Sequence, residues 1–153
     1  MSLIEKIRSE YRKTCIVDKP ERSDCVLSLR GISKPYLFID LDLRGSPLGP
    51  NDKKCDFLVY IDNVGEMPCV ASLEFKSTWR GKIVEQLQAG AKELEYRVPR
   101  DLQCRFRPIG VLGNFPKNKR KEIRQQVSFR DQEEPVRIIF CGDQLIKAIL
   151  RKK

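Results

Sequence analysis

Two acidic residues and one lysine form the set of side chains in this sequence best suited to chemistry. Glu74 and Lys76 are two positions apart on a predicted strand, so both side chains leave the same face of the sheet, while Phe75 points to the opposite face. Charges at alternate positions of an otherwise apolar strand are unfavourable unless they face a cleft or a ligand. We therefore expect Glu74 and Lys76 to line a functional site.

The position of Asp56 follows from the predicted hairpin. A turn centred on Gly65 would place Asp56 directly opposite Glu74, where Cβ atoms are about 5 Å apart and like charges repel. Such a pair suits a divalent cation, because Mg²⁺ takes one or two carboxylates plus water and phosphate oxygens. The sequence thus predicts a Mg²⁺ site, which Mn²⁺ is expected to fill as well, with the carbonyl of Phe75 as a further candidate ligand. The alternative is a cross-strand salt bridge on an exposed sheet face.

A metal at this place would support phosphodiester hydrolysis. It would bind a phosphate oxygen and lower the pKa of a bound water, while Lys76 would orient that water, help to deprotonate it, or stabilise the charge of the transition state. The chain contains no histidine. This excludes Ser-His-Asp triads, Cys-His nucleophile pairs and zinc sites ligated by histidine.

Positive charge is concentrated in one part of the chain. Residues 97–130 hold ten Lys and Arg against Asp101 and Glu122, and so carry nearly all of the net charge of +9. Phosphate contacts release condensed counterions, so a basic segment on a balanced body predicts a nucleic-acid partner and not a membrane. The alternative is a solvated loop that aids solubility. The expected phosphate-binding residues are Lys117, Lys119, Arg120, Lys121 and Arg124.

The six cysteines include no C-x-x-C pair, and the N-terminus has no secretory apolar run. We expect reduced thiols, several of them buried, in a cytoplasmic protein.

Hydrophobic patterns predict the elements that position these residues. Three consecutive strands indicate an antiparallel meander, and the helix that follows returns the chain as a crossover, so the next strand is parallel to its neighbour. The expected elements are a helix at 2–13, strands at 36–43, 57–61 and 70–75, a helix at 82–97, a strand at 105–112, a basic segment at 114–130, a strand at 136–141 and a helix ending at residue 150.

Asp56 and the triplet Glu74-Phe75-Lys76, in this order of elements, resemble the D…(D/E)-x-K motif of the PD-(D/E)XK nuclease superfamily, which has the restriction-endonuclease-like fold. The resemblance implies an α/β protein with an αβββαβ core over about residues 2–113, a mixed four-stranded sheet flanked by helices. The strand and helix of 136–150 would be appended to it within a single domain spanning 1–153. It also implies Mg²⁺-dependent cleavage of phosphodiester bonds, usually in DNA.

The same resemblance implies two further kinds of site residue. A helix glutamine, Gln86 or Gln88, would turn toward the site, and a glutamate of the first helix, Glu5 or Glu10, would add a metal ligand. Of the acidic residues before the motif, Asp40 and Asp42 share a strand face and are interpreted as solvent-facing or supporting charges, with extra metal ligands as the alternative.

Three functions remain open at this point: an active nuclease, a catalytically inactive module of the same fold that binds nucleic acid or assembles with a partner nuclease or helicase, and a nuclease subunit that a partner directs. A homodimer is compatible with each of them.

Overall fold

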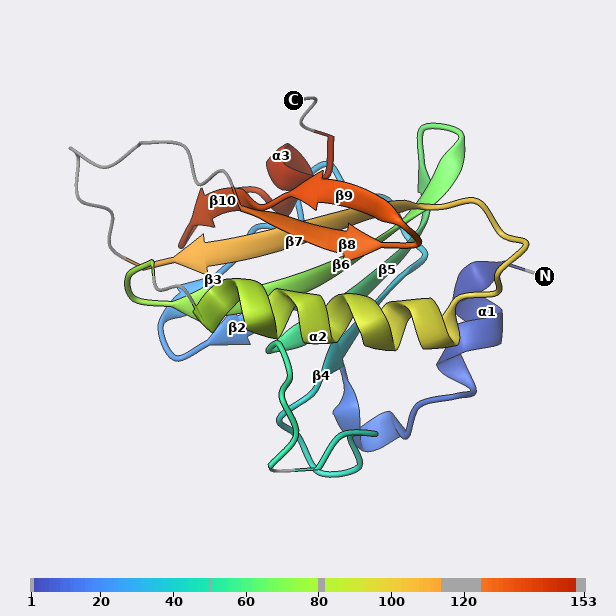
Figure 1. Cartoon of the computed structure of the whole chain (residues 1–153), viewed down its shortest axis with the longest axis horizontal. Coiled ribbons are helices and arrows are strands. Elements are labelled where there is room, and N and C mark those ends of the chain that lie inside the picture. The colour runs from blue at the N-terminus through green and yellow to red at the C-terminus, as the bar shows by residue number, and fades with distance from the viewer. Residues whose placement is uncertain (1, 50, 80–81, 114–124, 151–153) are drawn as a thin grey trace.

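A mixed β-sheet crossed by one long helix forms the centre of the molecule (Figure 1). The structure is a computed structural model that describes residues 2–49, 51–79, 82–113 and 125–150. In chain order, the elements of these residues are α1 (Leu3–Arg8), a 3-10 helix (Lys13–Cys15), β1 (Ile16–Val17), β2 (Glu21–Arg22), β3 (Cys25–Val26), β4 (Tyr36–Asp40), β5 (Phe57–Val64), β6 (Met67–Lys76), α2 (Lys82–Arg97), β7 (Arg105–Leu112), β8 (Gln126–Phe129), β9 (Gln132–Pro135), β10 (Arg137–Phe140) and α3 (Leu145–Leu150).

The central sheet has six strands in the described chain, so the expectation of four is wrong. Their order is β1-β4-β5-β6-β7-β10, with parallel pairs β6–β7 and β7–β10 and antiparallel pairs elsewhere. β10, expected as an appendage, pairs with β7. Ile138 and Ile139 explain this, because they pack against the cores on opposite faces of the sheet, as a strand inside a layered fold requires.

Two apolar layers enclose the sheet. On one face, α1 and α2 pack against strand residues that include Leu58, Tyr60 and Val70. On the other face, α3 and the segment after β3 cover Phe57 and its neighbours. The helical spacing predicted for α2 is confirmed, because its buried side chains face the sheet: Ile83, Leu87, Ala91 and Leu94. Their burial is the main stabilising contribution of the helix.

The position of α2 over β6 depends on Gly90. A Cβ atom at this residue would come within 2.7 Å of the Cβ of Ser72, so only glycine allows the helix to approach so closely. The hydroxyl of Ser72 donates to the carbonyl of Leu87 at 3.1 Å. These contacts fix which turn of the helix lies above the carboxyl end of β6.

The predicted register of the β5–β6 hairpin is confirmed where it matters for the site. Phe57 pairs with Leu73, and the same register continues to the pair of Ile61 with Cys69. Nearer the turn, the register shifts between Ile61 and Val64. The hairpin therefore contains a β-bulge or a similar irregularity there, and its turn is not symmetric about Gly65. One step beyond Phe57 and Leu73 lie Asp56 and Glu74.

Part of the basic segment, for which no strand was predicted, is regular structure. β8 and β9 form an antiparallel hairpin whose turn residues, Arg130 and Asp131, have φ angles of 50° and 62°. The ring of Phe129 stacks on Phe106 at 4.7 Å between centroids. The apolar alternation of Val127 and Phe129 spans only four residues, and the neighbouring charges obscured it in the sequence.

Two cysteines are oxidised, which corrects the expectation of reduced thiols. Cys25 and Cys141 form a disulfide across 116 residues of chain. The buried thiols of Cys15, Cys55 and Cys69 are free, as expected. Across the described parts of the chain, none of the helices has the length and apolar character that crossing a membrane requires.

Candidate active site at the ends of strands β5 and β6

Asp56 lies immediately before β5 and is held against the end of β6. Its backbone N–H donates to the carbonyl of Leu73 at 2.9 Å, and its Oδ2 accepts the N–H of Phe75 at 2.8 Å. Burial raises the pKa of the Asp56 carboxyl, while the Phe75 N–H and the guanidinium of Arg22 limit the increase. The backbone thus orients one carboxylate oxygen and leaves the other directed away from β6.

Glu74 is the most deeply buried carboxylate of the site. Its side chain is 3% exposed, and its Oε1 has no hydrogen-bond partner among the residues that the structure describes. Burial and the nearby charge of Asp56 raise its pKa to about 8, although Lys76 acts in the opposite direction. A buried acceptor without a donor is unfavourable, and a carboxylate in this state is a common feature of functional sites.

Lys76 ends β6 and lies on the same face as Glu74, as the strand period predicts. Its Nζ lies 3.3 Å from Oε2 of Glu74, and its side chain is 38% exposed. The ring of Phe75 faces the opposite layer, where it packs edge-on against Phe57 with centroids 5.6 Å apart. The ammonium group is therefore accessible from solvent while it contacts a buried acid.

Arg22 is a site residue that the sequence analysis missed. Its Nε lies 3.4 Å from Oδ1 of Asp56, and its terminal nitrogens donate to both oxygens of Asp40 at 2.7 and 2.8 Å. The guanidinium also lies over the ring of Phe57 at 4.2 Å and donates to Asp42 at 2.8 Å. Burial alone would lower the pKa of Arg22, but the partner carboxylates raise it overall. Arg22 is thus a permanent cation at this cluster.

The pair of Asp40 and Asp42 explains how Arg22 is held. Asp40 is buried, with 6% of its surface exposed, so the interpretation as a solvent-facing charge is wrong for this residue. Asp42 is more exposed and also contacts Lys54 at 3.6 Å. Both act as supporting charges. A buried acid on a strand signals a cation partner, but eighteen residues separate Asp40 from Arg22, and no local pattern links them.

A cavity of about 520 Å³ lies beside this charge cluster. Asp40 and Phe57 line it, together with Glu21 from the strand that carries Arg22. The remaining lining residues belong to β1 and the segment after it: Ile16, Val17, Asp18 and Lys19. Solvent therefore reaches the cluster from the edge of the sheet.

Gln86 is placed toward Glu74 by the geometry of α2. The helix connects parallel strands β6 and β7, so it runs antiparallel to β6, and Gln86 lies one turn before Gly90, toward the end of β6 that carries Glu74. Its Oε1 is buried and accepts no hydrogen bond from the described part of the chain. Two buried oxygen atoms without donors therefore occur at the same end of the sheet.

Gln88 binds the β8–β9 hairpin and does not face the candidate site. Its Nε2 donates to the carbonyl of Ser128 at 2.8 Å, and its Oε1 accepts the N–H of Ser128 at 2.9 Å. The side chain therefore fastens the β8–β9 hairpin to α2 and is not directed to the candidate site. Helical spacing could not distinguish Gln88 from Gln86, because the partner of Gln88 lies forty residues away.

We expect Gln88→Ala to lower the free energy of unfolding by about 1–3 kcal/mol, because it leaves both backbone groups of Ser128 without a partner. Urea denaturation followed by fluorescence measures this change. Gln86→Ala is the matched control and should cost less, since it removes an amide oxygen for which the described residues supply no donor. A larger loss for Gln86→Ala would contradict these assignments.

The glutamates of the N-terminal region do not join the site. Glu10 contacts Arg97, the last residue of α2, at 3.4 Å, and α1 lies beside this end of the helix (Figure 1). Residues 86 and 97 are eleven positions apart, about 16 Å along a helix. Glu5 is exposed on α1. The structure therefore gives no support to Glu10 or Glu5 as a ligand.

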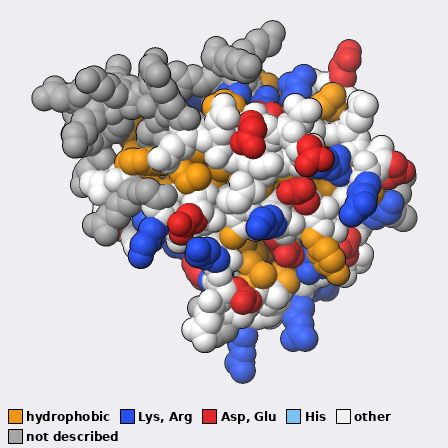
Figure 2. Space-filling model, viewed as in Figure 1, with side chains coloured by type: hydrophobic (Ala, Val, Ile, Leu, Met, Phe, Trp, Pro, Cys, Tyr) orange, Lys and Arg blue, Asp and Glu red, His pale blue; other side chains and the backbone are white. Residues whose placement is uncertain are grey.

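The expected phosphate-binding residues Lys117, Lys119, Arg120, Lys121 and Arg124 lie outside the described residues. Several other basic residues of 97–130 have structural partners: Arg130 donates to the carbonyls of Leu102 and Pro99, and Arg107 donates to that of Ile149. The face that carries α2 shows Lys and Arg interspersed with Asp and Glu (Figure 2). The described residues on this face thus form no uniform basic patch.

The donor set can be tested against the expected divalent cation. Asp56 and Glu74 supply two carboxylates, which is sufficient for Mg²⁺ when water and phosphate complete the coordination, and the free Oε1 of Glu74 leaves an acceptor for it. Protein side chains alone do not complete the coordination of a cation: within the described ranges, no three His, Cys, Asp or Glu side chains are grouped to hold a metal ion. The residues present fit a cation that substrate helps to bind.

Comparisons with known proteins add no relative: no protein-family model, no curated protein and no solved structure shows significant similarity to this chain.

Proposed function

We propose that this protein is a metal-dependent nuclease that hydrolyses phosphodiester bonds of nucleic acid, DNA in the first instance, with Asp56, Glu74 and Lys76 as its catalytic residues and Mg²⁺ as its cofactor. The observation that carries the proposal is the buried Oε1 of Glu74, to which no described residue donates although an acid and a lysine lie beside it. In a salt bridge with a purely structural role, a buried carboxylate oxygen without a donor would only be unfavourable.

In the proposed reaction, Asp56 and Glu74 hold the cation, and Mg²⁺ or Mn²⁺ when bound supplies a Lewis acid for phosphate and water. The N–H of Phe75 fixes the orientation of Asp56. Lys76 reaches both the acid and solvent, so it orients the attacking water and stabilises the negative charge that develops on the phosphate. Gln86, at the same end of the sheet, is proposed to position this water.

A catalytically inactive nucleic-acid-binding module is the second candidate. One observation favours it: Arg22 already contacts Asp56, so a positive charge is present without a metal. The two candidates differ in whether cleavage occurs, because both include binding to nucleic acid.

The test is a digestion panel. Supercoiled plasmid, linear duplex and single-stranded DNA and RNA are incubated with the protein in Mg²⁺, Mn²⁺ or EDTA, and products are separated on gels. We expect cleavage of DNA in both metals and none in EDTA, since phosphate cleavage at this site needs the cation.

The Asp56→Asn protein is the control for a contaminating nuclease. Cleavage by this variant at the wild-type rate would refute the site. Binding of DNA by the wild-type protein without any cleavage in either metal would establish the inactive module instead.

A further inference from the structure

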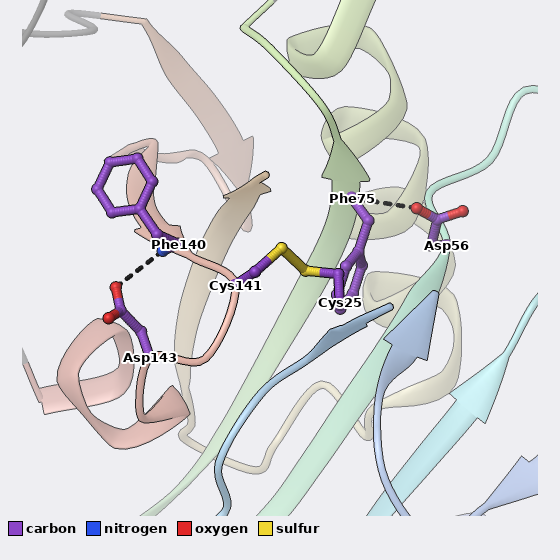
Figure 3. The surroundings of a disulfide bond; sticks show 6 residues. All are labelled: Cys25, Asp56, Phe75, Phe140, Cys141 and Asp143. Carbon is purple, nitrogen blue, oxygen red and sulfur yellow. Dashed lines mark hydrogen bonds between the residues drawn. A yellow bond between two sulfur atoms is a disulfide. The ribbon is translucent and has the colours of Figure 1, made fainter. Parts of the chain in front are cut away.

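The hairpin that delivers Arg22 to the site is covalently fastened three residues further along. β2 and β3 pair through only two residues each, Glu21–Arg22 with Cys25–Val26. Cys25 is bonded to Cys141, in the turn that follows β10 (Figure 3). The disulfide thus ties a two-residue strand pair, which is too short to be stable alone, to the C-terminal part of the sheet.

The same hairpin presents Arg22 to the acid that would hold a cation. Arg22 Nε and the N–H of Phe75 contact different oxygens of Asp56. A divalent cation on this carboxylate would meet the positive charge of the guanidinium within a few ångströms, and the two cations repel each other. The contact of Arg22 with Asp56 is therefore expected to weaken metal binding at this carboxylate.

We propose that the Cys25–Cys141 disulfide restrains Arg22 against Asp56, so that reduction of this bond increases the affinity of the site for divalent cations. The proposal rests on the metal site argued under the proposed function. A dithiol or a phosphine is the reductant: with a phosphine, the disulfide takes up two electrons and two protons to give two thiols, and the phosphine becomes its oxide with oxygen from water.

The release is local because main-chain hydrogen bonds hold the neighbouring segment. Gly142 N–H donates to Val26 at 3.0 Å, Ser28 N–H donates to Asp143 at 2.9 Å, and Leu145 N–H donates to Ser28 at 2.9 Å. Leu27 is also buried. Without the disulfide, residues 21–25 are held only by the two β2–β3 pairs and by the contacts of Arg22 with Asp40, Asp42 and Phe57. Both cysteines are half-buried, which leaves the bond within reach of a small reductant.

The experiment measures metal affinity without reductants that chelate metals. Mn²⁺ is titrated into the disulfide-bonded wild-type protein, into Cys25→Ser/Cys141→Ser, into Arg22→Gln, and into the triple variant, with free Mn²⁺ read by electron paramagnetic resonance. Cys104→Ser, which removes a half-buried free thiol, is the control. Hydrogen exchange of residues 21–28 is recorded by mass spectrometry on each protein.

We expect the double serine variant to bind Mn²⁺ at least threefold more tightly than the wild-type protein, with faster exchange at 21–25 only. Arg22→Gln should bind at least as tightly, and removing the disulfide from it should bring no further gain, because the two changes act through one interaction. Cys104→Ser should behave as the wild-type protein.

Two failures are distinguishable. If the wild-type and double serine proteins bind Mn²⁺ equally, or if exchange at 21–25 is unchanged, the restraint by the disulfide is refuted while the metal site stands. If no form binds Mn²⁺, Arg22→Gln included, the metal site itself is refuted, and the inference falls with it.

Discussion

Lys76→Ala is expected to lower the rate of Mg²⁺-dependent DNA cleavage by about 100-fold or more. Loss of one group that stabilises the developing charge of a transition state costs a factor of about 10²–10³. Lys76 fits this role because its ammonium group lies 3.3 Å from Glu74 and is still 38% exposed. Single-turnover cleavage with enzyme in excess measures the chemical step directly.

A second lysine provides the matched control. Lys53 also pairs with a glutamate, Glu85, at 3.3 Å, but both side chains are well exposed, and an exposed pair contributes little to stability. Lys53→Ala should retain the wild-type rate. A Lys76→Ala protein that is folded, by circular dichroism and urea denaturation, and that cleaves at the wild-type rate would refute the assignment of Lys76.

The order of the longer elements and the register of the central hairpin were predictable because both depend on local patterns. Near-continuous apolar runs define β5 and β6, and the register that pairs Phe57 with Leu73 brings Asp56 level with Glu74 when it is extended by one residue. The strand period then places Lys76 beside Glu74. These relations need no information about distant parts of the chain.

Long-range partners could not be predicted in this way. Arg22 meets Asp56 across 34 residues, and Cys25 meets Cys141 across 116; neither contact leaves a trace in local periodicity. β10 was expected as an appendage for the same reason, since its apolar pattern predicts a strand but not the neighbour with which it pairs. The sequence therefore predicted the two acids and the lysine of the candidate site, but not its arginine.

Glu74→Gln should stabilise the metal-free protein at alkaline pH and abolish cleavage. In the wild-type protein the pKa of Glu74 is about 8, against an ordinary value of 4.5. Between these values the folded protein binds the proton more tightly than the unfolded chain does, so the free energy of unfolding falls as pH rises. Below the ordinary value, and above the raised one, this dependence disappears.

The glutamine variant carries no such proton. At pH 5 it should be about as stable as the wild-type protein, and at pH 9 more stable by on the order of 3 kcal/mol. Urea denaturation in EDTA at both pH values measures the difference. Glu85→Gln, at an exposed position of α2, is the control and should show the same pH dependence as the wild-type protein.

Addition of Mg²⁺ at pH 9 extends this experiment to function. A cation that binds the folded wild-type protein stabilises it by mass action, and Glu74→Gln removes one of the two carboxylates that would bind it. We therefore expect Mg²⁺ to raise the stability of the wild-type protein and of Glu85→Gln at pH 9, and to leave Glu74→Gln unchanged. A Glu74→Gln protein less stable than the wild-type protein at pH 9 would show that ionised Glu74 stabilises the fold. That result would contradict the unfavourable burial of its charge, from which the catalytic role is argued.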